Sequence, residues 1–280
     1  MFSTKTLTIS LTVLGFVLAS CVSDKKVFSR KTELSSEATK RSSFEPRPAK
    51  AYRNTAVFDD TSVTAFYCQL DSADKQVDGA TIVFLEQPKE ASCRGQFIQA
   101  VLQRYEKVWV FSSNTGLPFS RALASDAQID YLQKYLKNFK VKAQGVWSEG
   151  HATVTAARLA KKLDLQWALF HDGIYDMEMA LSDEASLSLK KQLVEQFNSD
   201  DEEEIEKLSV AWDFDGLPKV TWTSFRSSAS QQLKDQAISF HRSLTAAGMQ
   251  ARNVEIKTQA KTLNDSDRFS LWQSLNQKLK

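Results

Sequence analysis

The chain has 280 residues, a length that allows one large domain or two small ones. It contains 36 Lys and Arg against 34 Asp and Glu, 42% hydrophobic residues, and only 9 Gly and 5 Pro. These values exclude a disordered chain, a collagen and a polybasic nucleic-acid-binding protein. The composition indicates a globular protein with a substantial buried core and no nucleic acid among its partners.

Residues 1–20 differ from the rest of the chain. Lys5 is followed by an apolar stretch that ends at Leu18, and the small residues Ala19 and Ser20 then precede Cys21. The stretch is shorter than the roughly 20 residues that a membrane-spanning helix needs. The pattern predicts a cleaved signal peptide.

The four residues Leu18-Ala19-Ser20-Cys21 resemble the lipobox of bacterial lipoproteins. The resemblance implies that Cys21 is lipidated and becomes the first residue of the mature protein, with the membrane as a partner through several acyl chains. No aspartate directly follows Cys21, so the resemblance implies the periplasmic face of the outer membrane. The alternative is a secretory signal followed by a cysteine that carries no lipid.

The other two cysteines, Cys68 and Cys93, would lie in a compartment that permits disulfides. A bridge between them closes a loop of 26 residues, for which the chain-entropy model gives a stabilisation of about 3.5 kcal/mol. Two buried free thiols are the alternative. Three cysteines and three histidines without zinc-type spacing predict no metal and no cofactor.

A tether over residues 21–54 is expected after the signal peptide, because this segment is rich in Ser, Lys, Arg, Glu and Pro and has little periodicity. Residues 22–54 carry nine basic and four acidic side chains, a net charge of +5. Since the whole chain has a net charge of +2 and Lys5 contributes +1, residues 55–280 carry −4. The basic tether could contact anionic lipid headgroups, although a solvated arm is the preferred interpretation.

A first αβ module is predicted over residues 55–175. Its expected strands are short apolar segments at residues 81–85, 108–111, 141–147 and 166–170. Its expected helices are one carrying Phe97, Val101 and Tyr105, one opened by a capping box at residues 125–128, and one at residues 152–163. The alternation of strands and helices predicts an α/β fold.

A second αβ module is predicted over residues 176–280. Its expected elements are strands at 177–181, 210–214, 219–223 and 253–257, and helices at 187–197 and 230–247, the last capped by Gly248. The acidic segment 199–206 is interpreted as a solvated loop or helix start. The fold prediction is therefore two small αβ modules after a lipidated flexible tether, with a single doubly wound sheet as the alternative.

Asp213-Phe-Asp215-Gly216 resembles the DxDG motif of haloacid-dehalogenase-type phosphatases, in which the first aspartate attacks phosphorus. Only 64 residues follow Gly216, however, whereas that family places the motif near the start of its domain. A simple chain reversal at Asp215-Gly216 is the competing interpretation.

Ser148 lies between an expected strand and an expected helix, where a hydrolase nucleophile elbow would sit. Gly145 precedes it by three residues instead of two, so the segment departs from GxSxG. Asp172 with His171 or His241 could complete a triad. The competing interpretation is a loop that caps the next helix through Ser148 or Thr153.

Leu117-Pro118-Phe119-Ser120 and Gly216-Leu217-Pro218 resemble the CPxC and cis-proline segments of thioredoxin-like proteins. Both cysteines of CPxC are absent, which excludes thiol-disulfide exchange at this position. The resemblance implies at most a degenerate thioredoxin-like binding module.

The pattern of helix, glycine turn and strand that ends in residues 240–256 is similar to OmpA C-terminal-like domains, and an earlier copy places Arg158 where that family has its helix arginine. The later copy has Gln236 in place of the arginine, and neither copy has the family's peptidoglycan-binding aspartate. Pilus-assembly lipoproteins of the CpaD type resemble this chain in the lipid anchor and in this order of helix, glycine and strand.

Two functions remain open on the sequence. The preferred hypothesis is a non-enzymatic outer-membrane scaffold or adaptor that contacts an envelope complex, such as a pilus or secretion apparatus, or peptidoglycan. It is preferred because no acid, base and nucleophile have convincing spacing. The alternative is a periplasmic hydrolase with Ser148 or Asp213 as nucleophile.

Overall fold

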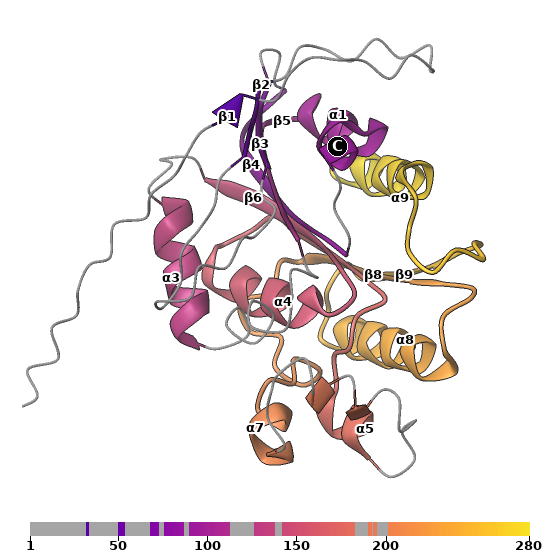
Figure 1. Cartoon of the computed structure of the whole chain (residues 1–280). Coiled ribbons are helices and arrows are strands. Elements are labelled where there is room, and N and C mark those ends of the chain that lie inside the picture. The colour runs from indigo at the N-terminus through magenta and orange to yellow at the C-terminus, as the bar shows by residue number, and fades with distance from the viewer. Residues whose placement is uncertain are drawn as a thin grey trace, which may run out of the picture.

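The computed structural model describes residues 32–33, 50–53, 68–72, 76–86, 90–112, 126–137, 142–182, 190–191, 193–194 and 201–280. Within this part of the chain, strands and helices alternate as an α/β fold (Figure 1). The predicted α/β layering is therefore confirmed. Among the described residues, no helix is both long and apolar enough to cross a membrane.

The strands join into one sheet with the order β1-β2-β3-β5-β4-β6-β7-β8-β9. Their bounds are β1 Thr32–Glu33, β2 Lys50–Arg53, β3 Cys68–Asp71, β4 Val77–Leu85, β5 Tyr105–Ser112, β6 Ala143–Glu149, β7 Trp167–His171, β8 Val220–Arg226 and β9 Arg252–Ile256. Pairing is antiparallel from β1 to β5 through β3, and parallel from β5 through β4 to β9. Because β7 pairs with β8, the strands of both predicted modules lie in one sheet, the arrangement of the alternative prediction.

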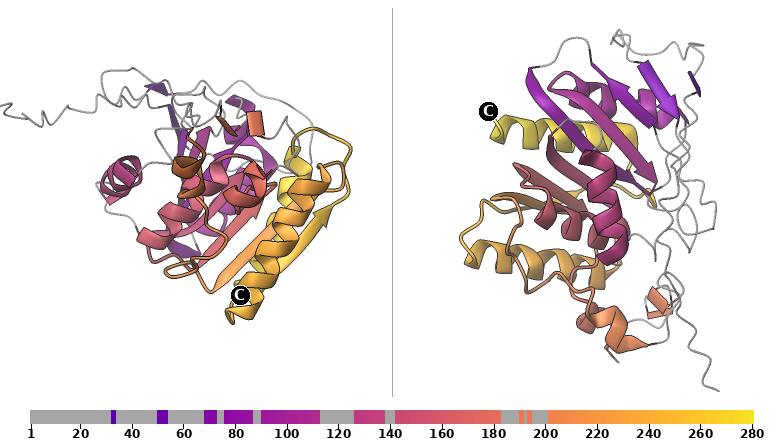
Figure 2. Two further views of the ribbon diagram at one scale, coloured as in Figure 1. Left: turned by 90° about the horizontal axis from the view of Figure 1, so that it is seen from below. Right: turned by 90° about the vertical axis from the view of Figure 1, so that its left-hand side faces the viewer.

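Helices cover both faces of this sheet. Their bounds are α1 Gln96–Leu102, α3 Asp126–Lys137, α4 Ala152–Lys162, α5 Met177–Leu181, α7 Glu202–Glu206, α8 Gln231–Ala246 and α9 Asp265–Lys278, with a 3-10 helix η1 at Glu90–Arg94. Helices α1 and α9 lie side by side on one face, whereas α3, α4 and α8 pack on the other (Figures 1 and 2). Both faces of β7 and of the C-terminal part of β4 are buried, which explains their nearly continuous apolar sequence.

The disulfide prediction is confirmed. Cys68 of β3 and Cys93 of η1 are bridged, and both are fully buried in the core between the sheet and the α1/α9 layer. The bridge therefore ties the segment that follows β4 to the antiparallel part of the sheet.

Several element predictions are wrong. Tyr105 begins β5 instead of extending the preceding helix, which ends at Leu102. The segment 177–181 is the helix α5, because the Asp176 side chain accepts a hydrogen bond from the Met179 N–H and caps it. Residues 210–214 form no strand, and Trp212 within them is 67% exposed. Helix α9 was not predicted at all.

The predicted tether is described only in part. Two short pieces of it, Thr32–Glu33 and Lys50–Arg53, form β1 and β2 at the edge of the sheet. Cys21 and the signal peptide lie outside the described residues, as does most of the predicted helix 187–197.

Candidate functional site

The carboxyl ends of four parallel strands meet at one edge of the sheet. Glu86 follows β4, Gly150 follows β6, Asp172 follows β7, and Arg226 ends β8. In open α/β sheets, ligands bind beyond the carboxyl ends of the strands where the direction of the connections reverses. Here β4 leaves through α1 on one face and β6 leaves through α4 on the other, so the switch point between the ends of β4 and β6 is the candidate site.

The turn after β6 is sharp and contains a glycine. The strand ends at Glu149, Gly150 has a φ of +58°, and α4 begins at Ala152. Phe84 pairs with Ser148, so the continued register places Glu86 beside Gly150. A Cβ atom on Gly150 would lie 3.4 Å from Oε1 of Glu86. The carboxyl group of Glu86 thus occupies the space next to this turn.

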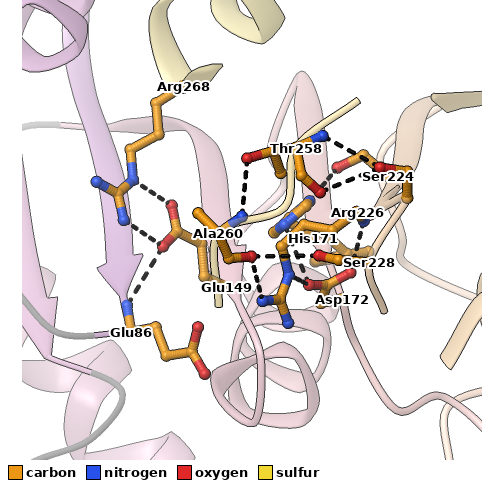
Figure 3. A network of polar contacts seen from close by, with 12 residues as sticks. Glu86, Glu149, His171, Asp172, Ser224, Arg226, Ser228, Thr258, Ala260 and Arg268 are labelled. Atoms are coloured by element: carbon orange, nitrogen blue, oxygen red, sulfur yellow. Dashed lines mark hydrogen bonds and ion pairs between the residues drawn. The ribbon is translucent and has the colours of Figure 1, made fainter. Parts of the chain in front are cut away.

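Glu149 is the buried neighbour of Glu86. Both of its carboxylate oxygens accept hydrogen bonds from Arg268 of α9, from Nε at 2.6 Å and from Nη2 at 2.8 Å, and Trp147 Nε1 donates to Oε1 at 3.1 Å. The main-chain N–H of Glu86 donates to Glu149 Oε2 at 3.4 Å (Figure 3). Glu149 is 1% exposed, so the bidentate contact with Arg268 holds its carboxylate in a fixed position under the site.

The surroundings of Glu86 favour its protonated form. Burial raises the pKa of this carboxyl, and the negative charges of Glu149 and Asp172 raise it further, against the opposing charges of Arg226 and His171. Glu86 remains partly exposed, so solvent and ligands can reach it. A partly accessible carboxyl with a raised pKa at the carboxyl ends of parallel strands is suited to general acid and base catalysis.

Asp172, at the end of the neighbouring strand, is held as an anion. Arg226 donates to it from the main-chain N–H at 3.0 Å and from Nε, and His171 Nε2 lies 3.3 Å from Oδ2. Burial would raise the pKa of Asp172, but the hydrogen bond and charge of His171, together with Arg226, lower it to about 2. Asp172 also has a φ of +47°, an unusual backbone conformation for a residue other than glycine.

Ser224 and His171 form a buried pair beside Asp172. Ser224 Oγ lies 2.9 Å from His171 Nδ1, and the two residues are paired in register between β7 and β8. The contacts have the order Ser, His, Asp of a hydrolytic triad. Ser224 is 0% exposed and lies within a strand that is paired on both sides, so a substrate carbonyl cannot reach its Oγ. This pair orients Asp172.

Ser148 does not lie at the turn where the sequence placed a nucleophile. It is 0% exposed inside β6, with Oγ 3.3 Å from Oγ1 of Thr153. Gly145, the supposed first glycine of the elbow, instead makes room for the indole of Trp167, which a Cβ would meet at 1.9 Å. The residue at the strand-to-helix turn is Gly150, which has no nucleophilic side chain.

Asp213 and His241 also lie away from the candidate site. Asp213 is exposed, precedes β8 and therefore lies toward the opposite edge of the sheet, where Lys161 Nζ pairs with it at 2.6 Å. His241 lies in the C-terminal half of α8, which runs from the end of β8 back to the start of β9 and so away from the site. Of the proposed triad members, the structure brings together only His171 and Asp172.

The other sequence motifs find no support as sites. The peptide bond before Pro218 is trans, and residues 117–120 lie outside the described part of the chain. Gln236 is buried and fully occupied, because it accepts from the N–H groups of Tyr175 and Asp176 and donates to the Asp176 carbonyl. Within the described residues, no group of three or more His, Cys, Asp or Glu could hold a metal ion.

Solved structures that share this fold include two peptidases. Acylaminoacyl peptidase from Pyrococcus horikoshii matches with a TM-score of 0.58 and 11% identity, over 85% of this chain and 42% of the peptidase. A puromycin-hydrolyzing peptidase from Mycobacterium tuberculosis matches with a TM-score of 0.55 and 12% identity, over 82% of this chain and 39% of the peptidase. This chain therefore spans about two fifths of the length of either peptidase. No family model matches the sequence, and no curated protein matches it.

At this identity the similarity establishes the fold alone. It nevertheless contradicts the preferred hypothesis of a non-enzymatic scaffold or adaptor, because the structures that share this fold include those of peptidases. The alternative hypothesis of a hydrolase is the better supported of the two. Neither of the residues first assigned to it stands at the turn after β6, because Ser148 lies inside β6 and Asp213 precedes β8.

Proposed function

We propose that the chain is a hydrolase that cleaves an ester or amide bond with Glu86 as its general base. The observation that carries the proposal is the position of the Glu86 carboxyl against the Gly150 turn. Hydrolases of this fold carry their nucleophilic side chain on the corresponding strand-to-helix turn. Here the turn residue is a glycine, and the carboxyl from the neighbouring strand end lies beside it.

The reaction we propose is a direct attack by water. Glu86 takes a proton from a water molecule as the water oxygen bonds to the carbonyl carbon of the substrate. The bond to the leaving alcohol or amine then breaks, and Glu86 returns the proton to that group. The raised pKa of Glu86 makes it a stronger base than an ordinary glutamate, and also a competent proton donor in the second step.

The start of α4 supplies the electrostatic stabilisation. Helix α4 begins directly after the turn, and its N-cap residue His151 makes no capping hydrogen bond with its side chain. The positive end of the helix dipole therefore faces the place where the carbonyl oxygen becomes negatively charged. Asp172 stays ionised beside it, so that Glu86 is the carboxyl of the site that exchanges protons.

We also propose that this hydrolase acts at the periplasmic face of the outer membrane, anchored through a lipidated Cys21. The lipobox-like segment that ends at Cys21 supports this location. The disulfide between Cys68 and Cys93 is compatible with an oxidising compartment. Radiolabelled palmitate should mark the wild type, and Cys21→Ser should lose both the label and membrane attachment.

The test of the activity uses the full-length chain in detergent with nitrophenyl esters and aminoacyl nitroanilides. The rate should rise with pH through a pKa above the ordinary glutamate value, because Glu86 must lose its proton to act as a base. Glu86→Gln should lower kcat by at least about 100-fold. A fluorophosphonate that labels activated serines should leave the protein active, because no serine attacks the substrate.

Glu203→Gln is the matched control, since Glu203 is exposed on α7 and pairs with Lys207 on the surface. It should retain the wild-type kcat. A wild-type protein that hydrolyses none of these substrates would refute the proposed activity for these bond types. Full activity of Glu86→Gln would remove Glu86 from the mechanism.

A further inference from the structure

The C-terminal helix α9 contacts the segments on both sides of Glu86. Near its start, Asp265 accepts hydrogen bonds from the main-chain N–H groups of Gln96 and Phe97, at 2.6 Å and 3.3 Å, and so caps α1. Gly95 leaves room for this cap, because a Cβ there would meet Asp265 Oδ1 at 2.3 Å. One turn further along α9, Arg268 reaches Glu149.

Arg268 is buried with its partner. The residue is 9% exposed, and its Nε and Nη2 atoms contact the two different oxygens of the Glu149 carboxylate. This fork fixes the rotation of the carboxylate as well as its distance. One of the two fixed oxygens is the acceptor for the main-chain N–H of Glu86.

We propose that Arg268 is a positioning residue, which locks the Glu149 carboxylate against the main chain of Glu86 and thereby sets where the Glu86 carboxyl lies beside Gly150. The proposal rests on the proposed function of Glu86. Arg268 touches no reacting atom and acts through Glu149. The C-terminal helix, which also caps α1 and accepts a hydrogen bond from Arg104 at Asn276, thus becomes part of the working site.

The charged groups that face Glu86 come from four elements of the fold. They are Glu149 at the end of β6, His171 and Asp172 at the end of β7, Arg226 at the end of β8, and Arg268 on α9, which Asp265 of the same helix also faces. Of these, Glu149 makes the largest charge contribution to the raised pKa of Glu86. Replacing both Glu149 and Arg268 by neutral residues should therefore let the pKa of Glu86 fall toward its ordinary value.

The experiment compares two variants of the full-length chain with the wild type. Glu149→Gln/Arg268→Met removes the ion pair and leaves no unpaired buried charge, which favours retention of the fold. Arg268→Lys keeps the positive charge but replaces the two-pronged donor with a single ammonium group. Arg242→Lys, an exposed arginine on α8, is the matched control.

Two measurements report on the variants. The first is the carboxyl titration of Glu86 by NMR with carbon-13-labelled glutamate, assigned with Glu86→Gln. The second is the pH profile of ester hydrolysis. We expect the double variant to titrate at least about half a pH unit below the wild type. Arg268→Lys should lower kcat at least about fivefold and shift the Glu86 amide resonance, whereas Arg242→Lys should do neither.

An unchanged Glu86 titration in a natively folded double variant would overturn the proposal. If the double variant does not fold, Arg268→Lys decides: an unchanged amide resonance of Glu86 would overturn the proposal. Failure of the proposed function is separately visible, because a wild type without hydrolysis still gives the titration and the amide shift.

Discussion

The turns after β6 and β7 both place a residue at positive φ, yet they treat a carboxyl group in opposite ways. After β6 the residue is Gly150, which has no side chain and leaves space for the carboxyl of Glu86 from the next strand. After β7 the residue is Asp172, which carries its own carboxylate and binds Arg226 with it. The first turn therefore leaves space for a carboxyl that can exchange a proton, Glu86, whereas the second turn carries a carboxylate that stays ionised, Asp172.

The partners of the two carboxyls explain this difference. Asp172 is surrounded by donors, and its pKa falls to about 2. Glu86 has burial and two negative neighbours around it, and its pKa is raised. Two carboxyls whose surroundings separate their pKa values take different roles, one that exchanges protons and one that stays ionised.

The largest effect on stability is expected from Asp172→Asn. Asparagine tolerates positive φ as well as aspartate does, so the change removes the charge without straining the turn. The Arg226 side chain, which is 13% exposed, then lacks its anion, and the free energy of unfolding should fall by about 3 kcal/mol at pH 7 in urea denaturation. Asp213→Asn, which removes only a surface pair, should stay within about 0.5 kcal/mol of the wild type.

The pH dependence sharpens this first prediction. The contribution of Asp172 is present above its unfolded pKa and is lost as pH falls toward about 2. The gap between the wild type and Asp172→Asn should therefore narrow over that acid range. A gap that stays constant down to about pH 2 would mean that Asp172 is not ionised in the folded protein.

A smaller effect is expected from Gly150→Ala. The positive φ of Gly150 costs alanine about 1 kcal/mol, and the new Cβ lies against Glu86 Oε1. Gly248→Ala is the matched control, because Gly248 has a φ of +78° and a Cβ there meets nothing within 4 Å. Both variants should lose about 1 kcal/mol, but only Gly150→Ala should lower ester hydrolysis. Equal activities would separate Glu86 from the turn.

Glu86→Gln should stabilise the protein at neutral pH. A carboxyl with a raised folded pKa contributes stability below its unfolded pKa, and this contribution is lost as pH rises through the folded value. The glutamine variant avoids that loss. Its melting temperature should exceed that of the wild type near neutral pH, and the difference should shrink toward acid pH. A lower melting temperature of Glu86→Gln at neutral pH would mean that folding does not raise the pKa of Glu86.

The smallest effect on activity is expected from Ser148→Ala. The Ser148 hydroxyl is buried, and its Oγ shares one hydrogen bond with Oγ1 of Thr153. Loss of this hydroxyl should therefore cost at most about 1 kcal/mol. Hydrolysis should continue at the wild-type rate. Loss of activity with native circular dichroism would restore Ser148 as the nucleophile and break the comparison of the two carboxyls.

The sequence located the central strands well because their burial is a local pattern. The apolar segments 81–85 and 166–170 correspond to β4 and β7, since strands covered on both faces must be apolar at nearly every position. Residues 177–181 were wrongly predicted as a strand because alternating apolar letters also fit a short helix whose cap, Asp176, decides the outcome. Helix α9 was missed, although Leu271, Trp272 and Leu275 have helical spacing and are buried.

Only part of the candidate site was predicted from the sequence. His171 and Asp172 were named as possible triad partners of Ser148, and they do stand at the end of the buried strand β7. Glu86 follows the apolar run 81–85 in the same way and could have been found by the same signal. Arg268 could not, because it lies 119 residues from Glu149 in the sequence.

The sequence by itself determined the α/β alternation, the pairing of Cys68 with Cys93, and the expectation of a lipid anchor at Cys21. These depend on local composition, spacing and compartment. Only the tertiary structure decided which residue stands at the strand-to-helix turn and which carboxyl lies beside it. Those facts depend on the register between β4 and β6 and on the φ of Gly150, which arise when strands distant in the chain pair in one sheet.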